Sequence, residues 1–228
     1  RANNAATVLH KDYPDKGMKW VELKMPKGEK PADWDSYTPA EQKNYLSLPN
    51  KQGEAQLADA LKYEGEQLQT CVGGYCRDVI DKKSQIFSLR DAEGNPYATV
   101  EAKPGKTWSE KSGVFYDNPE LESSWRKFSE DANLVSAEKG LQRPSNYILQ
   151  YPEWLKTNDP EMFAKYANVF EASPPSIAQI KGKGNRAPSE EHLPYVQDFV
   201  RSGKFSKDVG DLKNTGLIRE GDELMTPS

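Results

Sequence analysis

The chain has 228 residues, of which 31 are Lys or Arg and 35 are Asp or Glu, and its formal net charge is −4. This nearly balanced charge excludes a protein whose whole surface binds nucleic acid, and no apolar run approaches the ~18 residues that a membrane span needs. With 11 Tyr, 7 Phe and 5 Trp available for a core, we expect a soluble, ordered α+β body with long polar loops.

The first 53 residues are mostly polar, and we expect an N-terminal extension over 1–53 with one strand and one helix. Apolar residues alternate with polar ones over 18–23, which predicts a short strand near a core. Thr38 is followed by Pro39 and, three positions after the Thr, by Glu41. This spacing is typical of a capped helix start.

An amphipathic helix is predicted over residues 54–69. Leu57, Leu61 and Leu68 are spaced at i, i+4 and i+11, which places them on one helical face. This helix leads directly to Cys71.

A β-hairpin is predicted next. Residues 85–90 and 97–102 both have strand character, and the segment between them is rich in turn-forming residues, Asp91 to Pro96. A third strand is expected at 177–180, paired with the hairpin. The fold class that follows is α+β, with a small antiparallel sheet packed by helices.

Helical spacing over 118–139 and 159–171 predicts an inserted helical subdomain at 104–175. A last helix near 196–200 should cover the sheet. The expected organisation therefore has four parts: the extension at 1–53, an α+β core at 54–103 and 176–205, the insertion at 104–175, and a peripheral tail at 206–228.

The segment from Cys71 to Cys76 is one candidate for chemistry. A Cys at a helix N-terminus can be a nucleophile because backbone amides favour the thiolate, although free Cys residues often serve only in packing. Cys71 is therefore a candidate catalytic nucleophile, and His192 is a candidate general base for it. A Cys71–Cys76 disulfide is disfavoured because the N-terminus has no apolar signal region, and a protein that is not exported stays in a reducing compartment. The chain also lacks an initiator Met, which indicates a fragment of a longer protein.

The two Cys and two His of the chain lack the paired spacings of a metal site. We accordingly expect no metal and no cofactor.

The second candidate is the loop that follows the third strand. Its glycines let backbone N–H groups converge, and its Lys and Arg add positive charge, so that it is suited to a phosphate or another anion. The alternative is a solvated turn whose glycines serve backbone geometry. Arg90 and Glu101 of the hairpin alternate with apolar residues and either face a shared cleft or point to solvent. The candidate ligand-binding residues are Gly73, Gly74, Arg90, Lys181, Gly182, Lys183, Gly184, Asn185 and Arg186.

Several segments together resemble the PcfJ-like family in order and character. They are LKYEG at 61–65, CVGGY at 71–75, IFSLR at 86–90, Pro96, TVE at 99–101 and QIKGKGN at 179–185. The resemblance covers about 54–103 and 176–200. Family members commonly have a His before the Cys, whereas this chain has Thr70, so that a family His–Cys pair is not carried over. The insertion at 104–175 is a second departure from the family pattern.

The resemblance implies an accessory domain of a phage or conjugative-plasmid protein, located in the bacterial cytoplasm or within a phage particle. We expect it to bind an anionic ligand or a partner through its Cys-Val-Gly-Gly-Tyr and Lys-Gly-Lys-Gly-Asn-Arg segments. A phosphate-bearing ligand or nucleic acid is the expected partner of the 181–186 loop, and a protein is the expected partner of the 104–175 insertion. Two alternatives stay open: an enzyme that uses Cys71, and a virion structural or assembly protein whose inserted helices contact other subunits.

Overall fold

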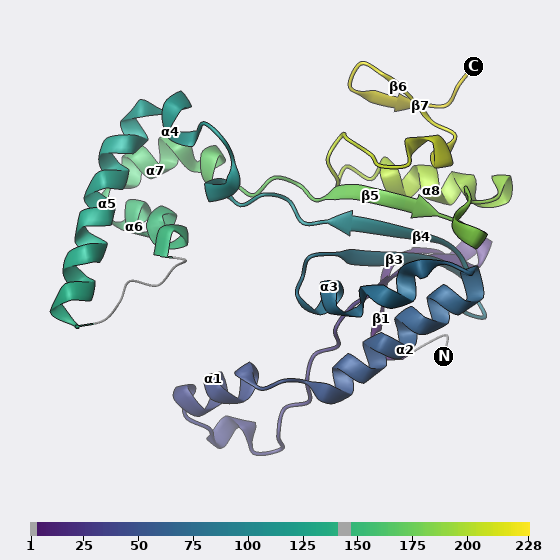
Figure 1. The fold of residues 1–228 in the computed structure, drawn as a ribbon, viewed down its shortest axis with the longest axis horizontal. Helices are drawn as coiled ribbons and strands as arrows, with labels where there is room; N and C mark the ends of the chain where they lie inside the picture. Colours follow the sequence, from purple (N-terminus) through teal and green to yellow (C-terminus); the bar gives the residue numbers. More distant parts are fainter. Residues whose placement is uncertain (1–3, 141–146) are drawn as a thin grey trace. The chain divides into compact units, whose positions relative to one another are not determined.

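The computed structural model of the chain describes residues 4–140 and 147–228 (Figure 1). The chain forms two compact units. Unit 1 contains Arg1–Pro104 and Pro175–Ser228, and unit 2 contains Gly105–Pro174. No helix in the described ranges is long and apolar enough to cross a membrane.

Unit 1 is built on a five-stranded antiparallel sheet whose spatial order follows the sequence. Its strands are β1 (Thr7–Tyr13), β2 (Met18–Leu23), β3 (Gln85–Asp91), β4 (Pro96–Lys103) and β5 (Ser176–Lys181). The α+β prediction is confirmed, as are the hairpin and the third strand. At the hairpin tip, the Asp91 side chain accepts hydrogen bonds from the backbone N–H groups of Glu93 and Asn95, which closes the turn.

The N-terminal residues contribute more than an extension. Strand β2 lies between β1 and β3, and both of its faces are buried: Met18 and Trp20 belong to one core cluster, Val21 and Leu23 to another. The short strand expected at 18–23 is therefore central, and β1 was not expected. Val8 and Leu9 of β1 are exposed, so that the burial pattern typical of a strand is absent there.

Two helices cover opposite faces of the sheet (Figure 1). Helix α8 (Leu193–Val200) covers the face that carries Phe87 and Leu89, and helix α2 (Lys51–Leu68) covers the face that carries Ile86. Since side chains alternate along a strand, the two faces belong to separate cores.

The remaining N-terminal helices are local. Helix α1 (Pro39–Ser47) begins with the expected capping box of Thr38 and Glu41. The other short helices of this half are η1 (Pro14–Lys16), η2 (Trp34–Ser36), η3 (Cys71–Tyr75) and α3 (Cys76–Ile80).

The tail is not wholly peripheral. Gly210 N donates to Ile177 O at 2.8 Å, and Asn214 Nδ2 donates to Ile180 O at 2.7 Å, so that residues near 210–214 satisfy the outer edge of β5. Leu217 is buried in the core beneath α8. Elements η9 (Leu212–Thr215), β6 (Ile218–Glu220) and β7 (Glu223–Met225) make up this region. The polar composition of the tail predicted a peripheral segment. These contacts were not predictable from it because they form only where β5 presents its backbone carbonyls.

Unit 2 is helical and has its own aromatic core of Trp108, Leu121, Phe128, Tyr151 and Leu155. Its elements are η4 (Trp108–Glu110), α4 (Val114–Asp117), α5 (Pro119–Glu138), η5 (Tyr147–Gln150), α6 (Tyr151–Asn158), α7 (Pro160–Tyr166) and η6 (Ala167–Phe170). The helix expected at 118–139 corresponds to α5. The helix expected at 159–171 ends as a 3-10 turn, and α6 was not expected.

Candidate functional site

A cavity of about 50 Å³ lies between the segment that follows α2 and the β4–β5 part of the sheet. Its lining comes from two regions that are distant in sequence. The lining residues are Thr70, Cys71, Val72, Tyr75, Ile86, Thr99, Glu101, Gln179, Lys181 and Asn185. Cys71 and part of the basic loop, singled out separately in the sequence, thus line one cavity.

Strand register explains the polar wall of this cavity. Thr99 pairs with Lys181 across β4 and β5, and Glu101 pairs with Gln179. These four side chains share the sheet face covered by α2, since the intervening Val100 belongs to the core beneath α8. The sheet therefore places a polar strip beside η3.

Close backbone packing positions Cys71. A Cβ atom added to Gly65 of α2 would lie 3.1 Å from Gly73 N and 3.2 Å from Thr70 O. Gln69 ends the helix in the left-handed region with φ 54°, and its N–H donates to Gly65 O. The small residue and the helix cap together let η3 turn back against α2, with Cys71 as its first residue.

The basic loop is divided between the cavity and the solvent. Gly182 is buried, and a Cβ there would lie 2.8 Å from Pro188 Cα, while Gly184 has φ 65°, so that both glycines serve backbone geometry. Lys181 and Asn185 line the cavity. The remaining two charged residues, Lys183 and Arg186, are exposed.

Each charged side chain of the cavity already has an oppositely charged neighbour. Lys181 Nζ lies 3.2 Å from Asp211 Oδ2, and Glu101 Oε2 lies 3.3 Å from Lys103 Nζ. Glu101 Oε2 also accepts a hydrogen bond from Ser84 Oγ at 2.9 Å. The cavity itself is therefore close to neutral, and the uncompensated positive charge lies outside it. Lys183 and Arg186 form no ion pair in the part of the chain that the structure describes.

One polar atom of the cavity wall has no partner. Thr70 Oγ1 is buried and makes no hydrogen bond within the ranges 4–140 and 147–228. A buried hydroxyl without a partner is unfavourable.

Arg90 was expected to bind a ligand, and the structure contradicts this. Its side chain is fully buried, and Nη2 lies 3.0 Å from Glu64 Oε2 of α2. Ser88 Oγ and Thr99 Oγ1 also donate to the Glu64 carboxylate, at 2.7 and 2.5 Å. Arg90 pairs with a buried carboxylate of α2 instead of a ligand. The pattern of strand β3 alone does not predict this partner, because Glu64 belongs to another element.

Burial raises the pKa of Glu64, while the Arg90 charge and the hydrogen bonds from Thr99 and Ser88 act in the opposite direction. Thr99 belongs both to this buried network and to the cavity lining. Glu101 was expected to share a cleft with Arg90. Glu101 lines the cavity, whereas Arg90 does not.

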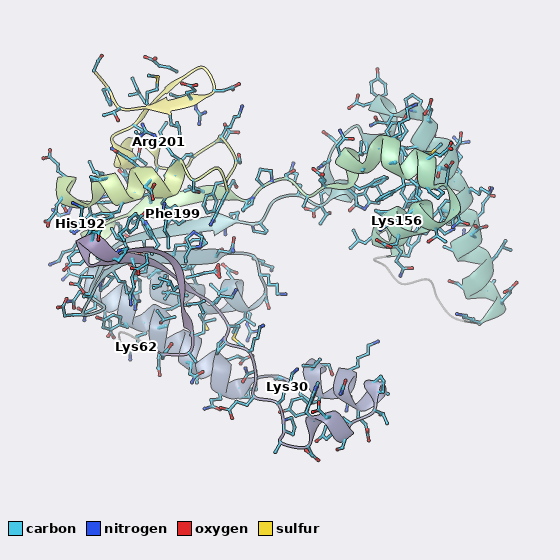
Figure 2. All side chains as sticks on the ribbon, turned by 180° about the vertical axis from the view of Figure 1, so that it is seen from behind. Lys30, Lys62, Lys156, His192, Phe199 and Arg201 are labelled. Atoms are coloured by element: carbon cyan, nitrogen blue, oxygen red, sulfur yellow. The ribbon has the colours of Figure 1, made fainter. Side chains whose placement is uncertain are left out.

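His192 is not brought to Cys71. Its ring stacks on Tyr97 at a centroid distance of 4.3 Å, and its Nδ1 lies 2.7 Å from Ser189 Oγ. It precedes α8 (Figure 2) and is absent from the cavity lining. The general-base prediction is therefore wrong in its geometry, because Tyr97 packs against the core beneath α8 while the cavity lies on the α2 face.

Both cysteines are free thiols, Cys71 exposed and Cys76 half-buried. Burial raises the pKa of the Cys76 thiol. Gly73 and Gly74 are exposed in η3 and do not line the cavity. Among the described residues, no cluster of three or more His, Cys, Asp or Glu side chains is arranged to hold a metal ion.

Sequence reasoning did not single out Thr99 or Gln179 as site residues, and it included Tyr75 only as part of the Cys-Val-Gly-Gly-Tyr segment. For Thr99 and Gln179 the signal was present: each lies two positions from a residue that was noted, Glu101 or Lys181, and therefore on the same strand face. The place of Tyr75 in the cavity wall depends on how η3 turns, which strand alternation does not predict.

Comparison with known proteins identifies a family that matches part of the chain. Residues 54–110 match the family model described as PcfJ-like protein. The matched segment contains most of α2, all of η3, α3, β3 and β4, and η4, and it includes the Cys71 and Glu101 walls of the cavity but not β5. No curated protein and no solved structure matches the chain. The PcfJ-like resemblance is thus confirmed within residues 54–110.

Proposed function

With a PcfJ-like segment at residues 54–110 as the premise, we propose that this chain is an accessory domain of a phage or mobile-element protein, and that it binds an anionic group of a ligand or partner at the mouth of the cavity. The observation that carries the proposal is the shared lining of that cavity by Cys71, Lys181 and Asn185. Loop residues that meet at the ends of strands and helices are the usual place for binding.

The size of the cavity limits what enters it. At about 50 Å³, it has room for roughly three to five water-sized groups, since one water needs about 10–15 Å³ on this measure. A single phosphate or carboxylate group fits this space, whereas a whole nucleotide does not. The rest of any larger ligand therefore lies along the exposed loop.

From the distribution of charge, we expect the anion at the rim of the cavity. Lys181 is already paired with Asp211, so the attraction comes chiefly from Lys183 and Arg186. Exposed ion pairs contribute at most about 1 kcal/mol each, so these two residues strengthen binding by no more than roughly 30-fold. Binding of this kind is weak and is screened by salt.

The test uses retention on heparin over a salt gradient. We expect the double variant K183Q/R186Q to elute at lower salt than the wild type. The matched control K16Q/K43Q changes two exposed Lys residues that do not line the cavity and lowers the net charge equally, so it should elute close to the wild type. Equal shifts in both variants would mean that retention follows total charge, and the proposal would then be abandoned.

A second candidate is a cysteine-dependent enzyme, favoured by one observation: the exposed thiol of Cys71 opens on the same cavity as Lys181. A nearby cation stabilises negative charge that develops during nucleophilic attack. If the chain is such an enzyme, we expect iodoacetamide to label Cys71 at pH 6 much faster than it labels free cysteine. Labelling of Cys71 at the rate of the free amino acid would exclude the cysteine-dependent enzyme.

A further inference from the structure

Unit 2 contains a larger cavity that the proposed function does not use. Its volume is about 400 Å³, within the range of about 300–1,000 Å³ that is typical of small-ligand sites. The lining residues that matter for its chemistry are Trp108, Lys111, Phe115, Tyr116, Trp125 and Ile148.

The walls of this cavity are mainly aromatic. Phe115 and Trp125 lie with ring centroids 5.6 Å apart, and Trp108 and Trp125 lie 6.1 Å apart. These rings belong to or pack against the core of unit 2, which holds them in place. Tyr116 is different, because 90% of it is exposed although it lines the cavity. It is available to cover a bound group.

The charge of Lys111 determines which ligand fits these walls. Lys111 is the charged residue of the lining, and its Nζ donates to the backbone carbonyls of Val169 and Glu171. An ammonium group has three N–H donors, so one remains. No ion pair of Lys111 with a carboxylate occurs among the residues that the structure describes.

A second polar group is the indole of Trp108. Its Nε1 is buried and has no hydrogen-bond acceptor within residues 4–140 and 147–228, and the side chain as a whole is 7% exposed. A buried donor without an acceptor costs free energy. Nε1 itself is closed to a group the size of a water molecule, so of these two groups Lys111 is the one that a ligand in the cavity meets.

Aromatic cavities often bind cations through their ring faces. Here the positive charge of Lys111 opposes a cationic ligand, and its remaining N–H group is a donor. The complement of this site is an acceptor with negative charge joined to an apolar body.

We propose that the unit 2 cavity binds a carboxylate attached to an aromatic or branched aliphatic group. The carboxylate accepts from Lys111, and the apolar body packs against Phe115 and Trp125. Two sources share this chemistry: a small free acid, and the C-terminal residue of a polypeptide.

The primary experiment needs no variant. The full chain is titrated by calorimetry with N-acetylphenylalanine and with its amide, which differ in charge and little in shape. We expect the acid to bind at least about tenfold more tightly, because a hydrogen bond to a charged partner is roughly twice as strong as a neutral one. Equal affinities, or no binding of either compound up to about 10 mM, would overturn the proposal.

A variant pair locates the binding. K111M should weaken binding of the acid about tenfold and leave the amide unchanged, whereas K156M should change neither. Lys156 (Figure 2) is an exposed Lys of the same unit that lies over Phe163, outside the lining. If K156M weakens the acid as much as K111M does, the site is elsewhere and the proposal fails.

A third ligand distinguishes the two possible sources of the carboxylate. It is a hexapeptide that ends in a free Phe carboxylate. Tighter binding of this peptide than of N-acetylphenylalanine supports a polypeptide C-terminus, and equal binding supports a free acid. The cavity lies within unit 2 and contains neither Lys183 nor Arg186, so these results are independent of the heparin test.

Discussion

Gly65 and Gly73 approach each other so closely that a Cβ on Gly65 would lie 3.1 Å from the backbone N of Gly73. This contact holds η3 against α2 and thereby sets the position of Cys71. The cavity beside Cys71 depends on a helix residue that does not line it.

Replacing Gly65 with Ala should move η3 without greatly changing stability. The added methyl group requires η3 to shift by a few tenths of an ångström, while Ala favours the helix by up to about 1 kcal/mol over Gly, and the two effects oppose each other. We expect a change below about 1 kcal/mol in the free energy of unfolding, together with an altered rate of iodoacetamide labelling at Cys71. The control is Gly74→Ala, where an added Cβ meets nothing within 4 Å. Unchanged labelling in G65A would contradict the role given to this contact.

The Glu64–Arg90 pair should be a stability determinant. Both side chains are fully buried, and replacing Glu64 removes the carboxylate that pairs with the Arg90 guanidinium. We expect E64A to lower the free energy of unfolding by about 3–5 kcal/mol. The double variant E64L/R90M should recover much of this loss, because a buried ion pair can be replaced by apolar groups. Urea denaturation measures both, and a loss in E64A below about 1 kcal/mol would show that the pair contributes little.

Stability should fall in mildly acidic solution because of His192. Burial lowers the pKa of His192 from 6.5, with the charge of Glu191 acting in the opposite direction. The unfolded chain then binds a proton near pH 6.5 that the folded chain resists. The stability linked to the neutral ring is therefore present above pH 6.5 and is lost as the pH falls through the lower folded pKa.

The measurement is the free energy of unfolding between pH 7.5 and pH 5, compared for the wild type and H192Q. The variant should show a shallower decline. Part of the slope should persist, since burial also lowers the pKa of His10. If H192Q keeps the full wild-type slope, His192 does not contribute to the acid sensitivity.

The two cysteines should differ in reactivity. Cys71 is exposed, whereas Cys76 is half-buried and burial raises the pKa of its thiol. At pH 7.5 we expect iodoacetamide to modify Cys71 first, as followed by peptide mass spectrometry. C71S should remove the fast phase and C76S should preserve it. Preferential modification of Cys76 would refute the exposures assigned to this segment.

Local sequence patterns predicted the elements that are formed by contacts between residues close in sequence. The hairpin around Asp91 was predictable because its strands are joined by one turn, and the α1 start was predictable because Thr38 caps its own helix. Helix α2 followed from the spacing of Leu57 and Leu61, both of which are buried. Each of these depends on residues within a few positions of one another.

Strand β1 and the integration of the tail were not predictable in this way. The exposed Leu9 gives β1 no alternating signal, and Asn214 acquires its role only when β5 presents a carbonyl to it. Such contacts depend on strand order and register, which single-strand patterns do not encode.

The same division applies to the candidate site. The sequence by itself determined that Cys71 follows an amphipathic helix and that Lys181 ends a strand. Tertiary structure decided that both line one cavity, that Arg90 faces Glu64 instead of a ligand, and that His192 stacks on Tyr97. The physical reason is that a helix or strand specifies which face each side chain occupies, whereas only the packed layers specify what that face meets.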